Sequence, residues 1–145
     1  MTRECANGTE VFDIVRRRYV ACTPEEWVRQ QLIHYLHFQL GYPLELMQVE
    51  GSISLNGMAR RCDIVIFRQA EGTLKPVMIV ECKQPSIPLN QKVLDQTCRY
   101  NIVLKVPLFL LTNGKHCLCV KVDFVRQNLT PITLPNWDEL SKVVS

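Results

Sequence analysis

No stretch of the 145-residue sequence approaches the roughly 20 consecutive apolar residues that a helix needs to cross a bilayer. The N-terminal segment MTRECANGTEVFDIVRRR has no hydrophobic region of the kind found in signal peptides, because acidic and polar residues interrupt it throughout. There is also no GxxxxGK(S/T) motif, which excludes a P-loop nucleotide site. These absences predict a cytoplasmic protein that does not span a membrane.

The sequence also lacks a CxxC pair, and its seven cysteines are odd in number. Four of them lie in strand-like apolar segments, at Cys62, Cys82, Cys117 and Cys119. Reduced cysteines that act as small core residues account for this distribution. A zinc site is not predicted, because the CxC at 117–119 has no second ligand pair at a usual spacing and the three histidines form no metal motif.

The residues that are present have the composition of an ordinary globular protein, with 47% hydrophobic and 21% charged residues. We therefore predict a single domain over residues 1–145, with an N-terminal arm at 1–18 and a C-terminal extension with a short helix at 124–145. The net charge of +3 permits a nucleic-acid partner without demonstrating one. The basic run Arg16, Arg17 and Arg18 fits either a solvated surface or contacts with phosphate.

Local signals predict a mixed α/β order. Thr23 and Pro24 open a helix, since threonine caps well and proline suits the first helical position, and Gly41 ends it. Turns are predicted at Asn56–Gly57 and Glu71–Gly72. The pattern gives helix, three strands, helix, two strands and helix, over 23–40, 46–55, 61–67, 77–83, 90–104, 107–111, 116–122 and from 135 onward. A strand–helix–strand crossover favours a central mixed β-sheet flanked by helices.

Three charged residues stand at the ends of apolar strands. Glu81 and Lys83 follow the run at 77–80, and because they are two apart on a strand they share one face. Asp63 opens the run at 63–67, and an antiparallel turn at 71–72 would bring it to the same end of the sheet as Glu81. Converging carboxylates repel unless a cation or a proton lies between them. The cluster is therefore either a structural group of ion pairs or a catalytic site.

In the catalytic alternative, the hard oxygen ligands suit Mg²⁺ or Mn²⁺. Asp63, Glu81 and the backbone carbonyl of Cys82 are the expected ligands. Lys83 would orient or help to deprotonate a water and offset developing charge on a phosphate.

The segment pattern resembles the N-terminal nuclease domain of the restriction (R) subunit of type I restriction enzymes. The similar stretches run in family order: TPEEWVRQ, RRCDIVIF, VECKQPSIPLNQ, DQTCRYN and LTNG. The resemblance implies a PD-(D/E)xK, restriction-endonuclease-like fold, with catalytic Asp63, Glu81 and Lys83. It further implies a metal-dependent DNA endonuclease that hydrolyses phosphodiester bonds with Mg²⁺ or Mn²⁺.

Further site residues follow from the same resemblance. Gln96 and Tyr100 form a QxxxY pair similar to that of the RecB-like branch, with Gln96 near the lysine and Tyr100 on the DNA; alone, the pair could also be helix surface. A glutamate from the first helix is expected at the metal, either Glu25 or Glu26. The remaining candidates for DNA contact or for polar support of the site are Arg99, Arg29, Gln30, Arg16, Arg17 and Arg18.

The sequence departs from this family in lacking the helicase motor of type I enzymes. ATP-driven restriction is therefore not expected of this polypeptide. A helicase or a specificity or modification subunit acting in trans, and a homodimer, stay open as partners beside DNA. The alternative functions are a non-catalytic DNA-binding or assembly module that retains the nuclease fold, and cleavage of RNA.

Overall fold

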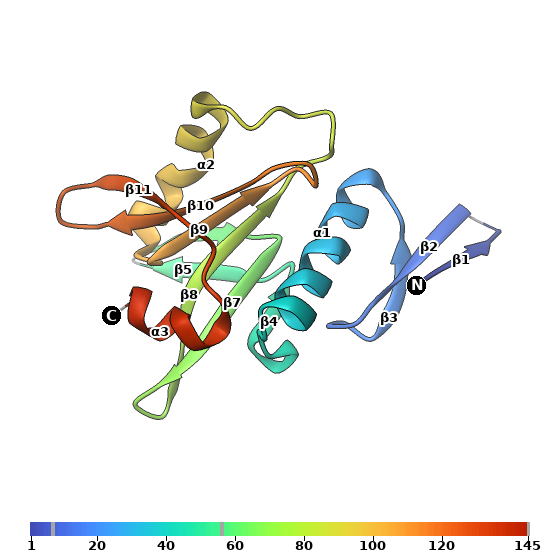
Figure 1. The fold of residues 1–145 in the computed structure, drawn as a ribbon, viewed down its shortest axis with the longest axis horizontal. Coiled ribbons are helices and arrows are strands. Elements are labelled where there is room, and N and C mark those ends of the chain that lie inside the picture. The colour runs from blue at the N-terminus through green and yellow to red at the C-terminus, as the bar shows by residue number, and fades with distance from the viewer. Residues whose placement is uncertain (7, 56, 145) are drawn as a thin grey trace.

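The computed structural model describes residues 1–6, 8–55 and 57–144, and leaves out the side chains of residues 58 and 100–103. A large β-sheet forms the centre, with helices on both faces (Figure 1). Helix α1 lies between this sheet and a small N-terminal sheet. The mixed α/β architecture predicted from the sequence is confirmed.

The large sheet has six strands in the order β11-β10-β9-β8-β7-β4. Strands β8 and β9 pair in parallel through a crossover that contains α2, and the other neighbours are antiparallel. The strands are β4 (Met47–Val49), β7 (Ile64–Ala70), β8 (Thr73–Cys82), β9 (Leu108–Thr112), β10 (Cys117–Asp123) and β11 (Asn128–Ile132).

The helices begin where the sequence predicts. In α1 (Pro24–His34) the Thr23 hydroxyl accepts from the Glu26 N–H at 3.0 Å, and the last turns continue as a π-helix, η1 (Tyr35–Gln39). Helix α2 (Gln91–Leu104) and helix α3 (Trp137–Val144) follow later, and a 3₁₀ turn, η2 (Leu44–Leu46), precedes β4. None of the described helices is long and apolar enough to cross a lipid bilayer.

Each of the two strands predicted around Asn56–Gly57 is split in two. Strand β5 (Ser52–Leu55) pairs with β6 (Met58–Arg61) in a separate two-stranded hairpin, whereas β4 pairs with β7. The break falls at Glu50, which has a φ of 56°, and opposite it at Asp63. Residue 56 of the predicted turn lies outside the described residues. The break frees Asp63 from the strand ladder.

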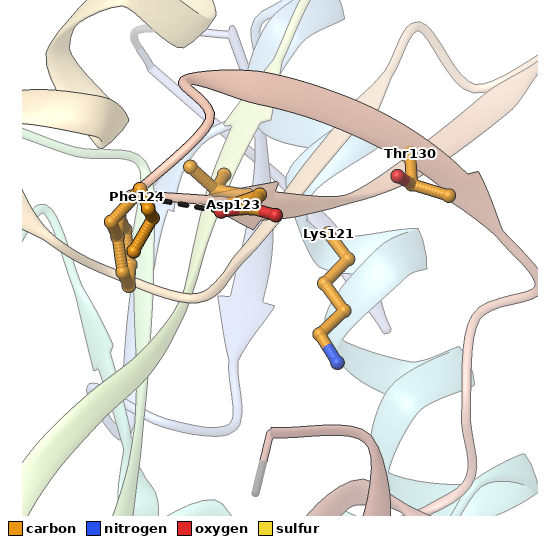
Figure 2. Close-up of a pocket in the computed structure, with 6 residues that line it drawn as sticks. Lys121, Asp123, Phe124 and Thr130 are labelled. Atoms are coloured by element: carbon orange, nitrogen blue, oxygen red, sulfur yellow. Dashed lines mark hydrogen bonds between the residues drawn. The ribbon is translucent and has the colours of Figure 1, made fainter.

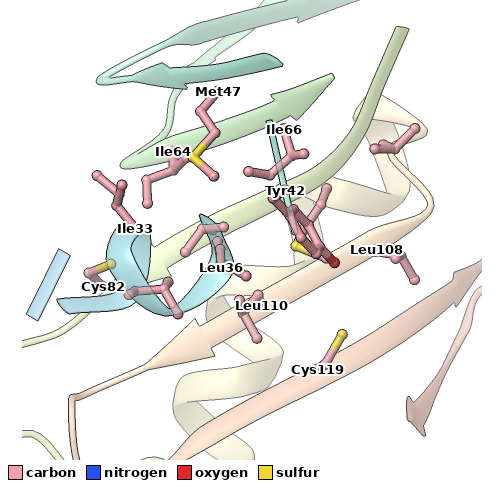
Figure 3. Packing of buried hydrophobic residues seen from close by; sticks show 14 of the residues in the cluster. Ile33, Leu36, Tyr42, Met47, Ile64, Ile66, Cys82, Leu108, Leu110 and Cys119 are labelled. Atoms are coloured by element: carbon pink, nitrogen blue, oxygen red, sulfur yellow. The ribbon is translucent and has the colours of Figure 1, made fainter. Parts of the chain in front are cut away.

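Two apolar clusters cover the two faces of the sheet. Ile64, Met78, Val80 and Leu110 pack with α1 and α3 on one face (Figure 3). The alternate residues, among them Ile79, pack with α2 and the β5–β6 hairpin on the other. Burying each such side chain stabilises the fold by about 2 kcal/mol. Because both faces of β8 are buried, its register with β7 and β9 is fixed along the strand as far as Cys82.

The chain ends are more structured than the sequence predicts. Residues 1–18 were expected to form an arm, but strands β1 (Thr2–Cys5), β2 (Gly8–Asp13) and β3 (Arg18–Ala21) form an antiparallel sheet there. Strand β11, in the expected C-terminal extension, was also missed. Neither strand is easy to predict from the sequence, because edge strands carry weak apolar patterns: β1 is rich in polar residues, and β11 contains Pro131.

Candidate active site

The strand register brings the acidic residues to one end of the sheet. Ile64 and Val80 lie directly opposite each other in the antiparallel β7–β8 pair, so Asp63 is next to Glu81. The parallel β8–β9 ladder extends to Lys83, whose N–H donates to the Thr112 carbonyl at 2.8 Å. Lys83 is therefore held in extended backbone two residues after Glu81, on the same face.

Asp63 is bound by backbone and side-chain donors. Its Oδ2 accepts from the Cys82 N–H at 2.7 Å, and its Oδ1 lies 3.3 Å from Nη1 of Arg29. The side chain is only 14% exposed. Burial raises the pKa of Asp63, although the Cys82 N–H and the charges of Arg29 and Lys83 oppose this shift. The folded protein therefore disfavours the charge on this carboxylate.

Glu81 has the same electrostatic character. Burial raises its pKa, the nearby Asp63 and Glu25 add to the shift, and the positive charges of Arg60 and Lys83 oppose it. The Arg60 guanidinium donates from Nη2 to the Glu81 carboxylate. Burial and the neighbouring carboxylates therefore outweigh the two positive charges at Glu81.

The two helix glutamates have different surroundings. Glu25 is exposed, and both its partial burial and the charge of Asp63 raise its pKa. Glu26 is buried and accepts from Arg29 at 2.6 and 2.8 Å, from Arg16 at 2.8 Å and from Gln30 at 3.1 Å. These bonds outweigh burial and lower the pKa of Glu26. The oxygens of Glu26 are already bonded to these partners. Glu25 is therefore the helix glutamate whose carboxylate has room for a cation.

The burial of Arg16, Arg29 and Gln30 does not fit the expected direct contacts with DNA. Arg29 and Gln30 are 7% and 1% exposed and bind Glu26. Arg16 binds both Asp13 and Glu26, with 15% of its side chain exposed. A phosphate contact would require each cation to leave a buried carboxylate, which is costly. These residues instead hold the buried carboxylates next to the site in place, through hydrogen bonds and ion pairs.

The other expected DNA contacts lie on the surface. Arg17, in the turn before β3, and Arg18, the first residue of β3, are exposed, and so are Gln96 and Arg99 on α2. Within the described residues, no hydrogen bond joins Gln96 to Lys83 or to either strand-end carboxylate. The side chain of Tyr100 lies outside the described residues. The structure thus brings together Asp63, Glu81, Lys83 and Glu25, and no hydrogen bond of the described residues adds Gln96 to this group.

A groove of about 570 Å³ opens beside these residues. It lies between the end of β3, the first turn of α1 and Gln84, and is lined in part by Glu25, Glu26, Arg29 and Glu50. A second hollow, of about 440 Å³, is lined by Lys121, Asp123, Phe124 and Thr130 (Figure 2). The strand register puts it at the opposite end of the sheet, whereas the groove borders Glu25 and Gln84, the residue after Lys83.

The oxygen atoms at the candidate site are the type of donor found in divalent metal sites. Within the described residues, no three histidine, cysteine, aspartate or glutamate side chains are grouped closely enough to hold a metal. Two partly buried carboxylates with raised pKa values, a strand-end carbonyl and a nearby third carboxylate nevertheless match the hard oxygen donors that Mg²⁺ prefers. The thiol of Cys82 is buried in the core cluster and faces away.

Sequence reasoning missed three contributors to the site. Arg60 binds Glu81, Asp13 binds Arg16, and Glu50 lies 3.6 Å from both Arg16 and Arg29. The basic pair before Cys62 and the lone Asp13 between apolar residues were visible signals. Asp13 and Arg16 are only three positions apart, whereas Arg60 and Glu81 are 21 positions apart, so no local pattern could identify the second pair.

The chain is similar to known proteins in its sequence family and in its fold. The family model "Type I restriction enzyme R protein N terminus (HSDR_N)" matches residues 24–135, more than three quarters of the chain. No curated protein matches the sequence. A crystal structure of a candidate nuclease belonging to DUF820, from Anabaena variabilis ATCC 29413, has the same fold, with a TM-score of 0.51 at 10% identity. The match covers 99% of this chain and 94% of the other.

Proposed function

The chain belongs to the type I restriction enzyme R protein N-terminal family and has a restriction-endonuclease-like fold, and from this we propose that it is a metal-dependent DNA endonuclease. The observation that supports this most is the convergence of Asp63 and Glu81 from adjacent strands, with Lys83 on the face of Glu81. Burial raises the pKa of both carboxyls despite the nearby positive charges, and perturbed carboxyls of this kind are common at functional sites.

In this proposal Asp63, Glu81, the Cys82 carbonyl and Glu25 hold a divalent cation, Mg²⁺ or Mn²⁺. The cation would supply Lewis-acid chemistry, polarising a phosphoryl oxygen and making a water more acidic. The Cys82 N–H and Arg29 fix the orientation of the Asp63 carboxylate. This second layer keeps the ligands in place before substrate arrives.

Lys83 has the catalytic role in the proposal. Its extended backbone, tied to Thr112, aims the ammonium beside Glu81. From there it orients the attacking water and offsets the negative charge that develops on the phosphate. The exposed Arg17, Arg18 and Arg99 are the proposed contacts to the DNA backbone.

The test is nicking of supercoiled plasmid and cleavage of single-stranded DNA with Mg²⁺ or Mn²⁺. Lys83→Ala and Glu81→Ala should each lower the rate by about 10³-fold. Lys142→Ala, an exposed lysine of α3, is the matched control and should cut like wild type. EDTA should stop all cleavage. An inert wild type, or equal cutting by all variants, would favour a binding module that retains the nuclease fold.

A further inference from the structure

Arg60 is a partly buried cation at the candidate site, and the proposed function gives it no role. It lies in β6, and its side chain is 14% exposed, against 18% for the Glu81 side chain that it contacts. Nη2 donates to the Glu81 carboxylate, and Nη1 donates to the Thr97 carbonyl of α2 at 3.0 Å. The guanidinium therefore links the metal-binding strand to the neighbouring helix.

The position of Arg60 is set by packing as well as by charge. It pairs with Ile53 across the β5–β6 hairpin, and Ile53 belongs to the same apolar cluster as Leu94 and Cys98 of α2. The hairpin is thus anchored on the helix without help from the ion pair. Loss of the contact to Glu81 would leave Arg60 attached to the edge of the site.

The guanidinium and a divalent cation would compete for the same carboxylate. Arg60 occupies an oxygen of Glu81, the central strand-end ligand of the proposed site. A dication at that oxygen would place two positive centres against each other in a partly buried location, where their repulsion is weakly screened. The two cannot both occupy this oxygen, Oε2 of Glu81, at the same time.

We propose that Arg60 is the built-in counter-ion of Glu81 in the metal-free protein, and that a divalent cation must displace its guanidinium from this carboxylate in order to bind. The displaced side chain keeps its bond to the Thr97 carbonyl. Arg60 is a positioning residue that lowers metal affinity and stabilises the empty site. This inference rests on the proposed metal site at Asp63 and Glu81.

The experiment is a calorimetric titration of the full chain with Mn²⁺, without DNA. Arg60→Gln removes the competing charge, so Mn²⁺ should bind about tenfold more tightly than in wild type. Arg60→Lys keeps the charge and should bind Mn²⁺ as weakly as wild type. Arg61→Gln is the matched control, because Arg61 is adjacent but its side chain is 73% exposed, and it pairs with Glu50. Its affinity should stay within about twofold of wild type.

Thermal melting provides a second readout that needs no activity. Without metal, Arg60→Gln should melt below wild type, because Glu81 loses its partner. Saturating Mn²⁺ should raise its melting temperature more than it raises that of wild type. Equal or weaker Mn²⁺ binding by Arg60→Gln overturns the competition and leaves the nuclease proposal standing. If neither wild type nor any folded variant binds Mn²⁺, the proposed metal site and this inference both fail.

Discussion

Two pairs of buried or partly buried acids lie close together in this protein and behave in opposite ways. The arginine-bound acids, Asp13 and Glu26, have lowered pKa values, because hydrogen bonds from backbone N–H groups and arginines outweigh the effect of burial. The strand-end acids, Asp63 and Glu81, have raised pKa values, because burial outweighs the charges of their neighbours. Arg29 contacts both groups.

The opposite pKa shifts distinguish two acids whose charge stabilises the fold from two acids whose charge destabilises it. Ionised Asp13 and Glu26 are compensated within the protein, so their charge favours folding. Ionised Asp63 and Glu81 are compensated only in part, so their charge opposes folding, and the proposed cation would remove this cost. Sites built for binding often cost stability in this way. Three substitutions, ordered by expected effect on the free energy of unfolding, test this contrast.

Glu26→Gln should have the largest effect. The change leaves the guanidinium of Arg29 buried with one fewer carboxylate, which should lower the free energy of unfolding by about 3 kcal/mol. Urea denaturation at pH 7 measures this loss, with Glu45→Gln, an exposed acid of η2, as control. A loss no greater than that of the control would mean that Glu26 is not a structural acid.

The pH dependence of this effect has a defined sign. Because the folded-state pKa of Glu26 is lowered, its ionised form stabilises the protein above the unfolded-state pKa. That contribution should disappear as the pH falls from the unfolded-state value of about 4.5 through the lower folded-state value. Wild type and Glu26→Gln should therefore converge in stability in acid.

Asp63→Asn should have a smaller effect of opposite sign. The amide oxygen can still accept from the Cys82 N–H, while the disfavoured charge is removed. We expect the metal-free protein to gain on the order of 1 kcal/mol at pH 7, and to lose the stabilisation by Mn²⁺. Thermal melts with and without Mn²⁺ measure both the gain in stability and the loss of stabilisation by Mn²⁺. A destabilised, still metal-responsive variant would contradict the assignment of Asp63.

Here the sign of the pH effect is reversed. The folded-state pKa of Asp63 is raised, so its charge costs stability at neutral pH. As the pH falls through the raised folded-state value, the folded protein takes up the proton and the cost disappears. The advantage of Asp63→Asn over wild type should therefore be present at pH 7 and vanish in acid.

Glu25→Gln should have the smallest effect on stability, within about 0.5 kcal/mol, because this side chain is exposed and solvent screens its charge. Its effect should appear instead as weaker Mn²⁺ binding in the calorimetric titration. The adjacent Glu26→Gln variant is the natural control, because it should show the reverse pattern. Unchanged Mn²⁺ affinity would remove Glu25 from the proposed ligand set.

Several elements could be read from the sequence because their causes are local. Thr23 caps α1 as expected, since the cap and its donor are three residues apart. The turn at Glu71 and Gly72, both with positive φ, places β7 against β8, and Asp63 falls at the predicted end of the sheet. The pairing of Glu26 with Arg16 could not be read in this way, because the two residues are ten positions apart and belong to different elements.

The sequence by itself determined the order of the main helices and strands, the convergence of Asp63 with Glu81, and the shared face of Glu81 and Lys83. Those features follow from apolar periodicity, turn residues and strand alternation, which act over a few positions. Only the tertiary structure decided which carboxylates are neutralised. Arg16 reaches Glu26 from the N-terminal sheet and Arg60 reaches Glu81 from the hairpin, because charge pairing depends on distances between segments that the fold brings together.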